Sequence, residues 1–393
     1  MVLVTRQKKY LLIARGSSHI SYFKHFADAS QLDAHVIKVN AIPFLPSHIP
    51  FLQLANNVSI ERLLIPHLAK KARKHPKLSK SFLWNIYKKL SRFFIKCDIA
   101  KSAALIDKRN ADVVGVWNGQ KQPSSSIAEA AKALGKEVVY FENGLLPNST
   151  TCDWKGVNCE NSLPRNSEFY RQFNSEKSLP NELVPRSPIA TKAKGVESEA
   201  LPKQYIFVPF QVETDSQIIS NSPWIRSMGQ FYHHLANVID KLNDKNIHIV
   251  IKEHPSESVR HDSLHHQHER ILFANQCNTQ LLIEGAEVIV TVNSTVGIES
   301  LLLGKRVIAL GNACYGIDEV CAQASSEEQL IHILNNLNLY EVNSEVKNGF
   351  LNCLYEHYVI PTAWGSVDDR HVEALTRRLL KEDTFSKMVE EAG

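Results

Sequence analysis

Three apolar stretches in the second half of the chain each end in a polar segment. The stretches span residues 205–210, 247–251 and 287–292 and are dominated by Val, Ile and Phe. Runs of this length and composition are typical of strands buried on both faces of a parallel sheet. The polar segments that follow are 211–217, 252–255 and 293–299. Ligands of open α/β sheets bind at the carboxyl ends of the strands, so these segments predict a binding site.

The first half of the chain shows a similar alternation of strand and helix patterns. Its predicted strands are 10–16, 34–39, 111–117 and 137–141, and its predicted helices are 19–29 and 125–134. Alternating βα units favour a parallel sheet covered by helices on both faces. We therefore expect an α/β protein with two Rossmann-like domains that face a cleft.

At 393 residues the chain exceeds the usual size of a single core, which favours two domains. We expect a first domain at 1–180, with a helical insertion at 50–108, and a second domain at 200–370. Residues 371–393 are predicted to form a C-terminal helix. The stretch 175–203 lacks periodicity and is rich in Ser, Pro, Lys and Glu, which is typical of a connection between domains.

The composition is that of a soluble globular protein. Hydrophobic residues make up 44%, charged residues 22%, and the net charge is +4, which suits small anionic ligands and does not call for nucleic acid. The seven cysteines have no paired spacing, and no apolar run approaches the ~20 residues of a membrane-spanning helix. We therefore expect reduced thiols and a cytoplasmic location.

The segment after the third strand combines hydroxyls with a predicted helix start. Asn293, Ser294 and Thr295 are followed by Gly297 and Glu299. Hydroxyls and free N–H groups at a helix start favour phosphate, and we expect the glycine to let a ligand approach the backbone closely. The alternative is a plain helix cap made by Ser294 or Thr295.

The second strand ends in Lys252 and then His254-Pro255. Proline has no N–H and ends the strand, which sets the direction of the histidine. Because Lys252 and His254 are two residues apart, we expect them to point to the same side and to share a phosphate ligand. A lone histidine is more often structural.

Carboxylates follow a strand in each predicted domain. Asp215 lies between Gln211 and Gln217, and Glu142 ends the strand before Asn143-Gly144. Such a carboxylate is a candidate base, nucleophile or hydroxyl binder. The alternative is a capping role, because Asp favours turns and helix starts.

A metal site is not expected. His261, His265, His266 and His268 lie close together in the sequence, but no carboxylate-histidine motif accompanies them, so a solvated face is favoured. The chain also has no Asp-x-Asp triplet, which many metal-binding sugar-nucleotide transferases carry. We predict a protein without a cofactor or a catalytic metal.

The segment 82–96 is helical in pattern, aromatic and basic. The simpler interpretation is a helix whose apolar face packs on the domain. The alternative is peripheral contact with the inner membrane or with a lipid-linked acceptor.

Four stretches together resemble the bacterial capsule and lipopolysaccharide β-Kdo transferases, which have a two-domain, GT-B-like architecture. They are 141–147, 211–217, 252–255 and 293–302, with Gly311 and Tyr315 behind the last. The resemblance covers about 110–320 and implies a retaining transferase that takes Kdo from CMP-Kdo. The acceptor it implies is an oligosaccharide or a lipid-linked glycan.

The resemblance also implies roles for the residues. Asp215 would be the nucleophile, Glu142 the acid/base for the acceptor, and His254 would assist departure of CMP. Contacts to the donor are expected from Lys252, Pro255, Asn293, Ser294, Thr295, Gly297, Glu299, Gln211 and Gln217, and contacts to the acceptor from Asn118, Gly119, Asn143 and Gly144. Asn-Ser-Thr departs from the Ser-Ser pair of sialyltransferases, which leaves open which hydroxyl meets the phosphate.

Two alternatives remain open at this point. One is an inverting or other CMP-sugar transferase of the sialyltransferase-like kind, in which Asp215 or Glu142 is a general base. The other is a polysaccharide-binding or assembly protein that uses the same fold without catalysis.

Overall fold

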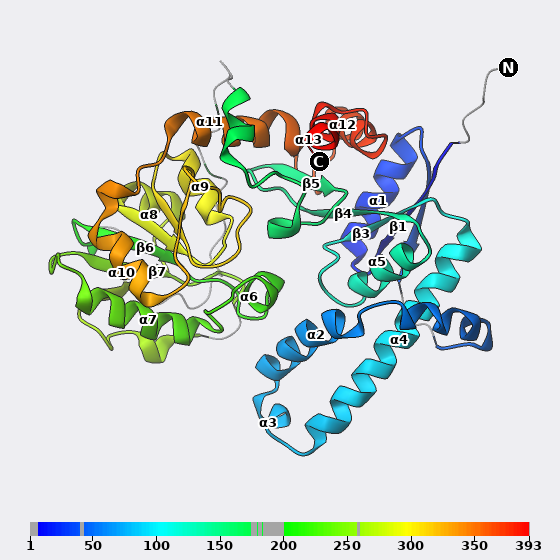
Figure 1. The fold of residues 1–393 in the computed structure, drawn as a ribbon, viewed down its shortest axis with the longest axis horizontal. Helices are drawn as coiled ribbons and strands as arrows, with labels where there is room; N and C mark the ends of the chain where they lie inside the picture. The colour runs from blue at the N-terminus through cyan, green and yellow to red at the C-terminus, as the bar shows by residue number, and fades with distance from the viewer. Residues whose placement is uncertain are drawn as a thin grey trace. The chain divides into compact units, whose positions relative to one another are not determined.

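The computed structural model describes residues 7–39, 43–173, 179, 183, 200–257 and 260–392. The chain divides into two units (Figure 1). The first contains residues 1–144, 148–162 and 358–393, and the second contains 145–147 and 163–357. These bounds differ from the predicted ones, because the C-terminal residues belong to the first unit. Most of the predicted connection at 175–203 lies outside the described residues.

The first unit is built on a six-stranded sheet whose core is parallel. In spatial order its strands are β2 (Asp33–Lys38), β1 (Lys9–Ala14), β3 (Val113–Trp117), β4 (Glu137–Asn143), β5 (Ser149–Asp153) and β12 (Ile360–Pro361). The first four are parallel, whereas β5 runs antiparallel to β4 and β12 antiparallel to β5. The segment after β4 thus returns along the sheet as β5.

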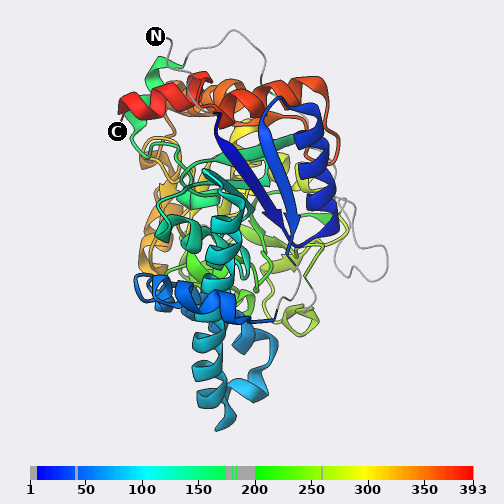
Figure 2. The same ribbon diagram turned by 90° about the vertical axis from the view of Figure 1, so that its right-hand side faces the viewer.

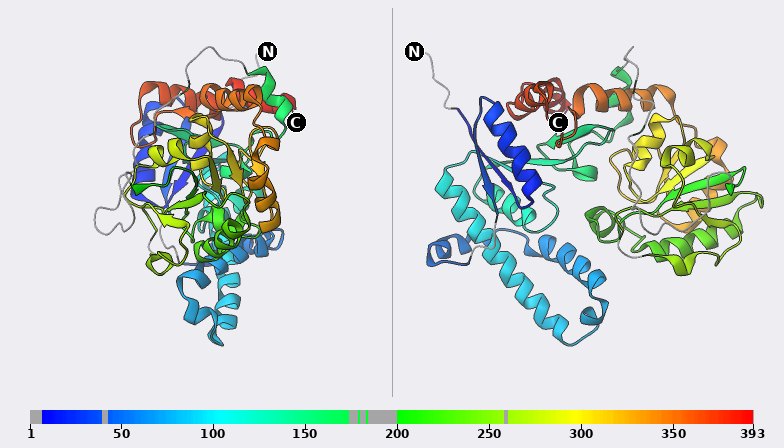
Figure 3. Two further views of the ribbon diagram at one scale, coloured as in Figure 1. Left: turned by 90° about the vertical axis from the view of Figure 1, so that its left-hand side faces the viewer. Right: turned by 180° about the vertical axis from the view of Figure 1, so that it is seen from behind.

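Helices cover both faces of this sheet because successive residues of β1 point to opposite sides. Tyr10 and Leu12 pack with α1 (Ser17–Ala29) and α12 (Asp369–Leu379), and Leu11 and Ile13 pack with α4 (Leu83–Arg109) and α5 (Ser124–Ala133). Seen from behind, α1 lies along β1 and β2 (Figure 3).

The predicted C-terminal helix is two helices, α12 and α13 (Thr384–Ala392). Lys381 has a φ of 58°, and its N–H donates to Arg378 O while Glu382 N–H donates to Arg377 O. This pair of hydrogen bonds around a left-handed residue is the Schellman arrangement, which ends α12.

The region predicted as a helical insertion extends away from the sheet of the first unit (Figure 2). It contains the 3-10 segments η1 (Pro46–Leu52) and η2 (Leu54–Asn56), then α2 (Ile60–Lys74), α3 (Pro76–Ser79) and α4. The carboxyl-terminal half of α4 enters the core through Ile99, Ala103 and Ile106. Its amino-terminal half contacts α2, where Tyr87 meets His67 and Arg92 pairs with Glu61.

The second unit is built on an entirely parallel sheet. In spatial order its strands are β11 (Ala322–Gln323), β10 (Val307–Ala309), β9 (Val288–Thr291), β6 (Tyr205–Pro209), β7 (His248–Lys252) and β8 (Ile271–Phe273). α7 (Met228–Lys241) and α10 (Glu327–Asn335) cover one face, and α8 (Thr279–Gly285) and α9 (Val296–Leu302) the other (Figure 1). The remaining helices among the described residues are α6 (Ser216–Ser220), α11 (Ser344–Cys353), η3 (Asn158–Glu160), η4 (Ser167–Gln172), η6 (Asp262–Leu264), η7 (Leu337–Leu339) and η8 (Leu354–Tyr358). The predicted α/β class with two Rossmann-like domains is confirmed.

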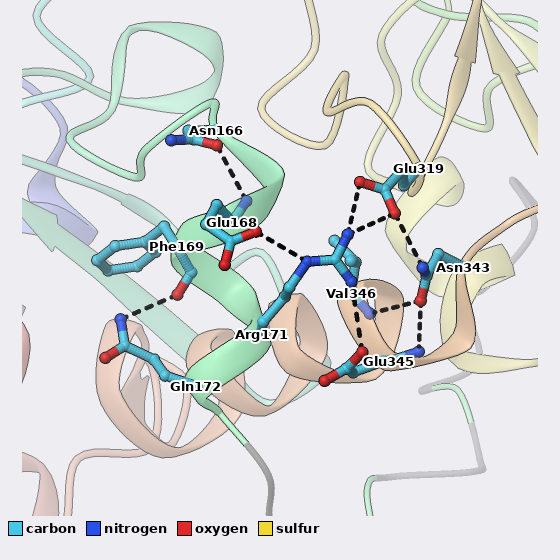
Figure 4. Close-up of polar contacts among 9 residues, drawn as sticks. All are labelled: Asn166, Glu168, Phe169, Arg171, Gln172, Glu319, Asn343, Glu345 and Val346. Atoms are coloured by element: carbon cyan, nitrogen blue, oxygen red, sulfur yellow. Dashed lines mark hydrogen bonds and ion pairs between the residues drawn. The ribbon is translucent and has the colours of Figure 1, made fainter.

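An ion-pair cluster around Arg171 ties η4 to α11 within the second unit (Figure 4). The Arg171 guanidinium donates to Glu319 at 2.7 and 2.8 Å, to Glu168 at 3.0 Å and to Glu345 at 3.3 Å. Asn343 donates to Glu319 at 2.9 Å and caps α11. Hydrogen bonds from Arg171 hold the pKa of the Glu319 carboxyl below its ordinary value of 4.5.

We expect Arg171→Ala to lower the melting temperature near neutral pH and to have less effect in acid. A carboxyl whose pKa is depressed by folding contributes stability above its unfolded value, and that stability is lost as the pH falls through the folded one. The loss from Arg171→Ala should therefore be largest above about pH 4.5 and shrink below it. Thermal unfolding from pH 3 to 7 tests this, with Arg226→Ala as an exposed control; a pH-independent difference would contradict it.

Candidate active site

The three strands that carry the predicted site are neighbours in the sheet of the second unit. β6 lies between β7 and β9, and all three are parallel, so their carboxyl ends meet at one edge. The chain builds outwards from β6 to β7 and β8, then returns to place β9 on the other side of β6. The carboxyl ends of β6 and β9 thus flank a topological switch point, which is where open α/β sheets bind ligands.

Two buried amides join β6 and β9 at this point. Gln211 Nε2 donates to Asn293 Oδ1 at 3.0 Å, and Asn293 N–H donates to Gln211 Oε1 at 3.1 Å. Asn293 Nδ2 also donates to the carbonyls of Gln217 and Asn221, at 3.2 and 3.0 Å. The structure therefore gives Gln211 and Asn293 a positioning role, because they hold the loops around Asp215 and Ser294 together.

Asp215 is half-buried and forms the N-cap of α6. Its Oδ1 accepts a hydrogen bond from Gln217 N–H at 2.9 Å, and Ser216 Oγ lies 3.4 Å from the same oxygen. The capping role considered from the sequence is therefore present. It fixes the carboxylate at the carboxyl end of β6, beside the switch point.

Ser294 and Thr295 are half-buried at the start of α9. Ser294 Oγ accepts from Val296 N–H at 3.2 Å, and the Ser294 carbonyl accepts from the Tyr315 hydroxyl at 2.7 Å. Glu299 lies in the first turn of the same helix and is also half-buried. The predicted donor-binding hydroxyls thus lie on the loop that Asn293 and Tyr315 position.

Gly297 is required for packing, a role that the sequence did not reveal. A Cβ at this position would lie 2.3 Å from Cζ of Tyr315, a distance that real Cβ contacts do not reach. Tyr315 is fully buried, so the ring has no room to move away. The glycine makes space for this ring, and the expectation that it also lets a ligand approach the backbone stays a prediction.

Lys252, at the end of β7, and His254, just after it, have different hydrogen-bond partners. Lys252 Nζ donates to the carbonyls of Cys277 and, at 3.1 Å, Asn275, and burial lowers the pKa of the ammonium. His254 is half-buried and precedes Pro255; its Nδ1 accepts from Ser256 N–H at 3.1 Å, which leaves the neutral ring's proton on Nε2. The contacts of Lys252 are with the residues after β8, and a ligand shared with His254 stays a prediction.

In the first unit, the predicted acceptor residues gather at the carboxyl ends of β3 and β4, which are neighbours. Asn118 Nδ2 donates to Glu142 Oε2 at 2.5 Å, and Asn143 N–H donates to Glu142 Oε1 at 2.9 Å. Gly119 has a φ of 74°, and a Cβ on it would lie 2.4 Å from the Tyr140 ring. Gly144 similarly makes room for Ser149 at the turn into β5. The glycines shape the loops, and Asn118 orients the carboxylate.

An aromatic group beside these residues was missed in the sequence. The His19 and Trp117 rings are stacked with their centroids 3.9 Å apart, and Trp364 meets Trp117 edge-on at 5.2 Å. Trp364 Nε1 donates to Asn143 Oδ1 at 2.8 Å, and burial lowers the pKa of His19. Trp117 directly precedes Asn118 at the end of a strand. This position is the one local signal in the sequence that could have marked Trp117 as a site residue.

The clustered histidines, which were not expected to bind a metal, contact aromatic rings or a carboxylate. His265 stacks on Phe273 with centroids 4.0 Å apart, His261 meets Phe210 edge-on, and His268 lies 3.1 Å from Asp240. Within the described part of the chain, no group of three or more His, Cys, Asp or Glu is arranged to hold a metal ion.

Comparisons with known proteins find similarity to capsule polysaccharide proteins. A family model described as capsule polysaccharide biosynthesis protein matches residues 186–346. Protein FixF of Sinorhizobium fredii is 38% identical over 251 residues, which are 63% of this chain and 60% of that protein. The capsule polysaccharide export protein KpsS of Escherichia coli is 26% identical in an alignment of 248 residues that covers 48% of this chain and 64% of that one. The chain thus spans less than two thirds of the length of either relative.

Solved structures similar to this chain include a Thermosulfurimonas dismutans KpsC beta Kdo 2,7 transferase. Its TM-score is 0.46 at 14% identity, covering 95% of this chain and 100% of that one. Another is the Neisseria meningitidis UDP-GlcNAc 2-epimerase bound to UDP-GlcNAc, with a TM-score of 0.40 at 12% identity, covering 96% and 100%. The family match at 186–346 contains all three strand-end segments of the second unit, and it confirms the predicted resemblance of this chain to bacterial capsule polysaccharide biosynthesis proteins.

Proposed function

We propose that this protein is a glycosyltransferase that moves Kdo from CMP-Kdo to a surface-polysaccharide acceptor, with retention at the anomeric carbon. The observation that supports it most is the convergence of Asp215, His254 and Ser294 on adjacent parallel strand ends at a switch point, within the part of the chain that matches the capsule family. The relatives named for capsule polysaccharide and for Kdo transfer suggest the donor and the acceptor.

The proposed reaction has two displacements. The Asp215 carboxylate attacks the anomeric carbon of Kdo, the bond to the CMP phosphate oxygen breaks, and CMP leaves. An acceptor hydroxyl, whose proton passes to Glu142, then attacks the same carbon and releases Asp215. Two inversions give net retention.

Departure of CMP concentrates negative charge on its phosphate, so groups that stabilise this charge lower the barrier. We assign this role to His254 and to the hydroxyls of Ser294 and Thr295. Glu299 is assigned to the ribose or cytosine. The proposal needs no metal ion and no cofactor.

The acceptor is assigned to the first unit. Glu142, oriented by Asn118, supplies the base, and Asn143 supplies hydrogen bonds to sugar hydroxyls. The half-buried rings of Trp117 and Trp364 supply apolar surface for the face of a sugar ring. We place the reaction in the cytoplasm, where the seven free cysteines are compatible with a reducing environment.

The direct test is incubation with CMP-Kdo and synthetic acceptors in buffer containing EDTA, followed by NMR of the product. A β-Kdo product supports the proposal. An inverted product indicates the alternative of a general-base mechanism, and loss of activity in EDTA that magnesium restores contradicts the metal-free reaction. Consumption of another CMP-sugar in place of CMP-Kdo would correct the donor.

We expect His254→Ala, and Ser294→Ala combined with Thr295→Ala, each to weaken CMP binding about ten- to a hundredfold, because each removes contacts to a charged phosphate. Titration calorimetry with CMP measures this. His248→Ala is the matched control, since His248 lies at the opposite end of the same strand. Unchanged affinity in both site variants would remove the phosphate site.

A second candidate is a polysaccharide-binding or export-assembly protein without catalysis. The name of the KpsS relative, an export protein, and the capping role of Asp215 favour it. CMP binding separates the two, because an assembly protein gains nothing from a nucleotide site. If CMP leaves the melting temperature unchanged and CMP-Kdo is not consumed, this candidate replaces the first.

A further inference from the structure

The amino-terminal half of α4 exposes an apolar stripe. Among the described residues fourteen large hydrophobic side chains are exposed, and six of them lie between Phe82 and Phe94. Phe82 is 81% exposed, Phe93 59% and Phe94 58%. Together with Ile86 and Leu90 they recur every three or four residues, which places them on one side of the helix.

This stripe is separate from the surface that α4 uses to pack. Ser91 and Ile95 of the same segment are buried, and Ile95 belongs to the core cluster that also contains Leu63 and Leu64 of α2. The helix therefore has its packing face filled and a second apolar face left exposed. The simpler interpretation from the sequence, in which the apolar residues pack on the domain, accounts for the first face alone.

The surrounding region is strongly basic. Residues 60–97 contain eleven Lys and Arg but only one acidic residue, Glu61, which pairs with Arg92. The rest of the chain has 34 basic and 40 acidic residues, so this region carries more than the whole net charge of +4. Lys89 and Arg92 are exposed beside the stripe.

We infer that residues 60–97 dock this protein on an anionic phospholipid surface, with the stripe inserted into the headgroup layer. An exposed apolar face flanked by Lys and Arg is the pattern by which helices lie in a membrane interface. Each basic residue near an anionic surface adds attraction, and the aromatic rings suit the boundary between headgroups and acyl chains. No helix among the described residues is both long and apolar enough to cross a membrane.

Co-sedimentation with vesicles tests this inference independently of any enzymatic activity. The full chain is expected to bind vesicles of equal parts phosphatidylglycerol and phosphatidylcholine, and to bind vesicles of phosphatidylcholine alone at least tenfold more weakly. Two variants should each lose at least tenfold in affinity for the anionic vesicles: Phe93→Ser with Phe94→Ser, and Lys88→Glu with Lys89→Glu and Arg92→Glu.

Each variant has a matched control. Leu281→Ser with Leu339→Ser removes two exposed apolar side chains of the second unit, and Lys24→Glu with Lys203→Glu and Lys387→Glu makes the same charge change outside 60–97. Both controls should bind anionic vesicles as the unaltered protein does. The inference is overturned if the unaltered protein does not bind, if the site variants bind normally, or if the controls lose as much. It is also overturned if the protein is a dimer that Phe93→Ser with Phe94→Ser converts to a monomer, since a second copy would then cover the stripe.

Discussion

Replacing Asp215 by asparagine is expected to reduce Kdo transfer by at least about a thousandfold while CMP still binds. The amide is no nucleophile, so the first displacement fails. The fold should persist, because Asn caps helices as well as Asp does and its Oδ1 can still accept from Gln217 N–H. Asp215→Ala, in contrast, also removes the cap of α6 and should cost about 1 kcal/mol of stability.

The matched control is Asp368→Asn. Asp368 also caps a helix, α12, by accepting from His371 N–H at 2.9 Å, but it lies outside the proposed site. Its variant should transfer Kdo at the normal rate. Near-normal transfer by Asp215→Asn would eliminate Asp215 as the nucleophile.

Intact-protein mass spectrometry tests the same step directly. With CMP-Kdo and no acceptor, the second displacement cannot occur, so the protein should gain the mass of one Kdo on the peptide that contains Asp215. An adduct on Glu142 would reverse the two assigned roles.

Gly297→Ala is expected to destabilise the second unit by about 1–3 kcal/mol, because the new methyl group overlaps the buried Tyr315 ring. Displacing the ring also breaks its hydrogen bond to the Ser294 carbonyl, so CMP should bind more weakly. Urea unfolding and CMP titration measure the two effects. Gly229→Ala is the control, because a Cβ there meets nothing within 4 Å and alanine favours the helix. If Gly297→Ala is as stable as the unaltered protein, the packing reason for this glycine is wrong.

Local sequence was sufficient for the parallel strands and for the polar segments after them. A strand buried on both faces has to be apolar throughout, so β6, β7 and β9 appear as continuous runs of Val, Ile and Phe. The same reasoning failed for β5, whose residues Ser149–Asp153 are mostly polar yet all buried, because their polar groups find partners elsewhere in the fold. Thr150 Oγ1 donates to Thr362 O, and Asp153 Oδ2 accepts from Ser162 N–H and the Tyr358 hydroxyl. Polar composition there concealed a strand.

The roles of single residues depended on contacts that are distant in the sequence. Gln211 and Asn293 are 82 positions apart, and only the strand order β9-β6-β7 brings their amides together. The space at Gly297 is filled by the Tyr315 ring. Trp117 meets Trp364, which belongs to the last part of the chain, where the chain returns to the first unit. Likewise, the sequence marked 82–96 as aromatic and basic, but packing decided which apolar side chains stay exposed.

The sequence by itself therefore determined the α/β class, the strand ends and the chemical types of residue at them, because hydrophobic periodicity and strand direction are local properties. The tertiary structure alone decided which of those residues hold one another in place and which remain half-exposed beside the switch point. Strand order and side-chain packing arise from pairings across the whole chain, and no short window of sequence contains them.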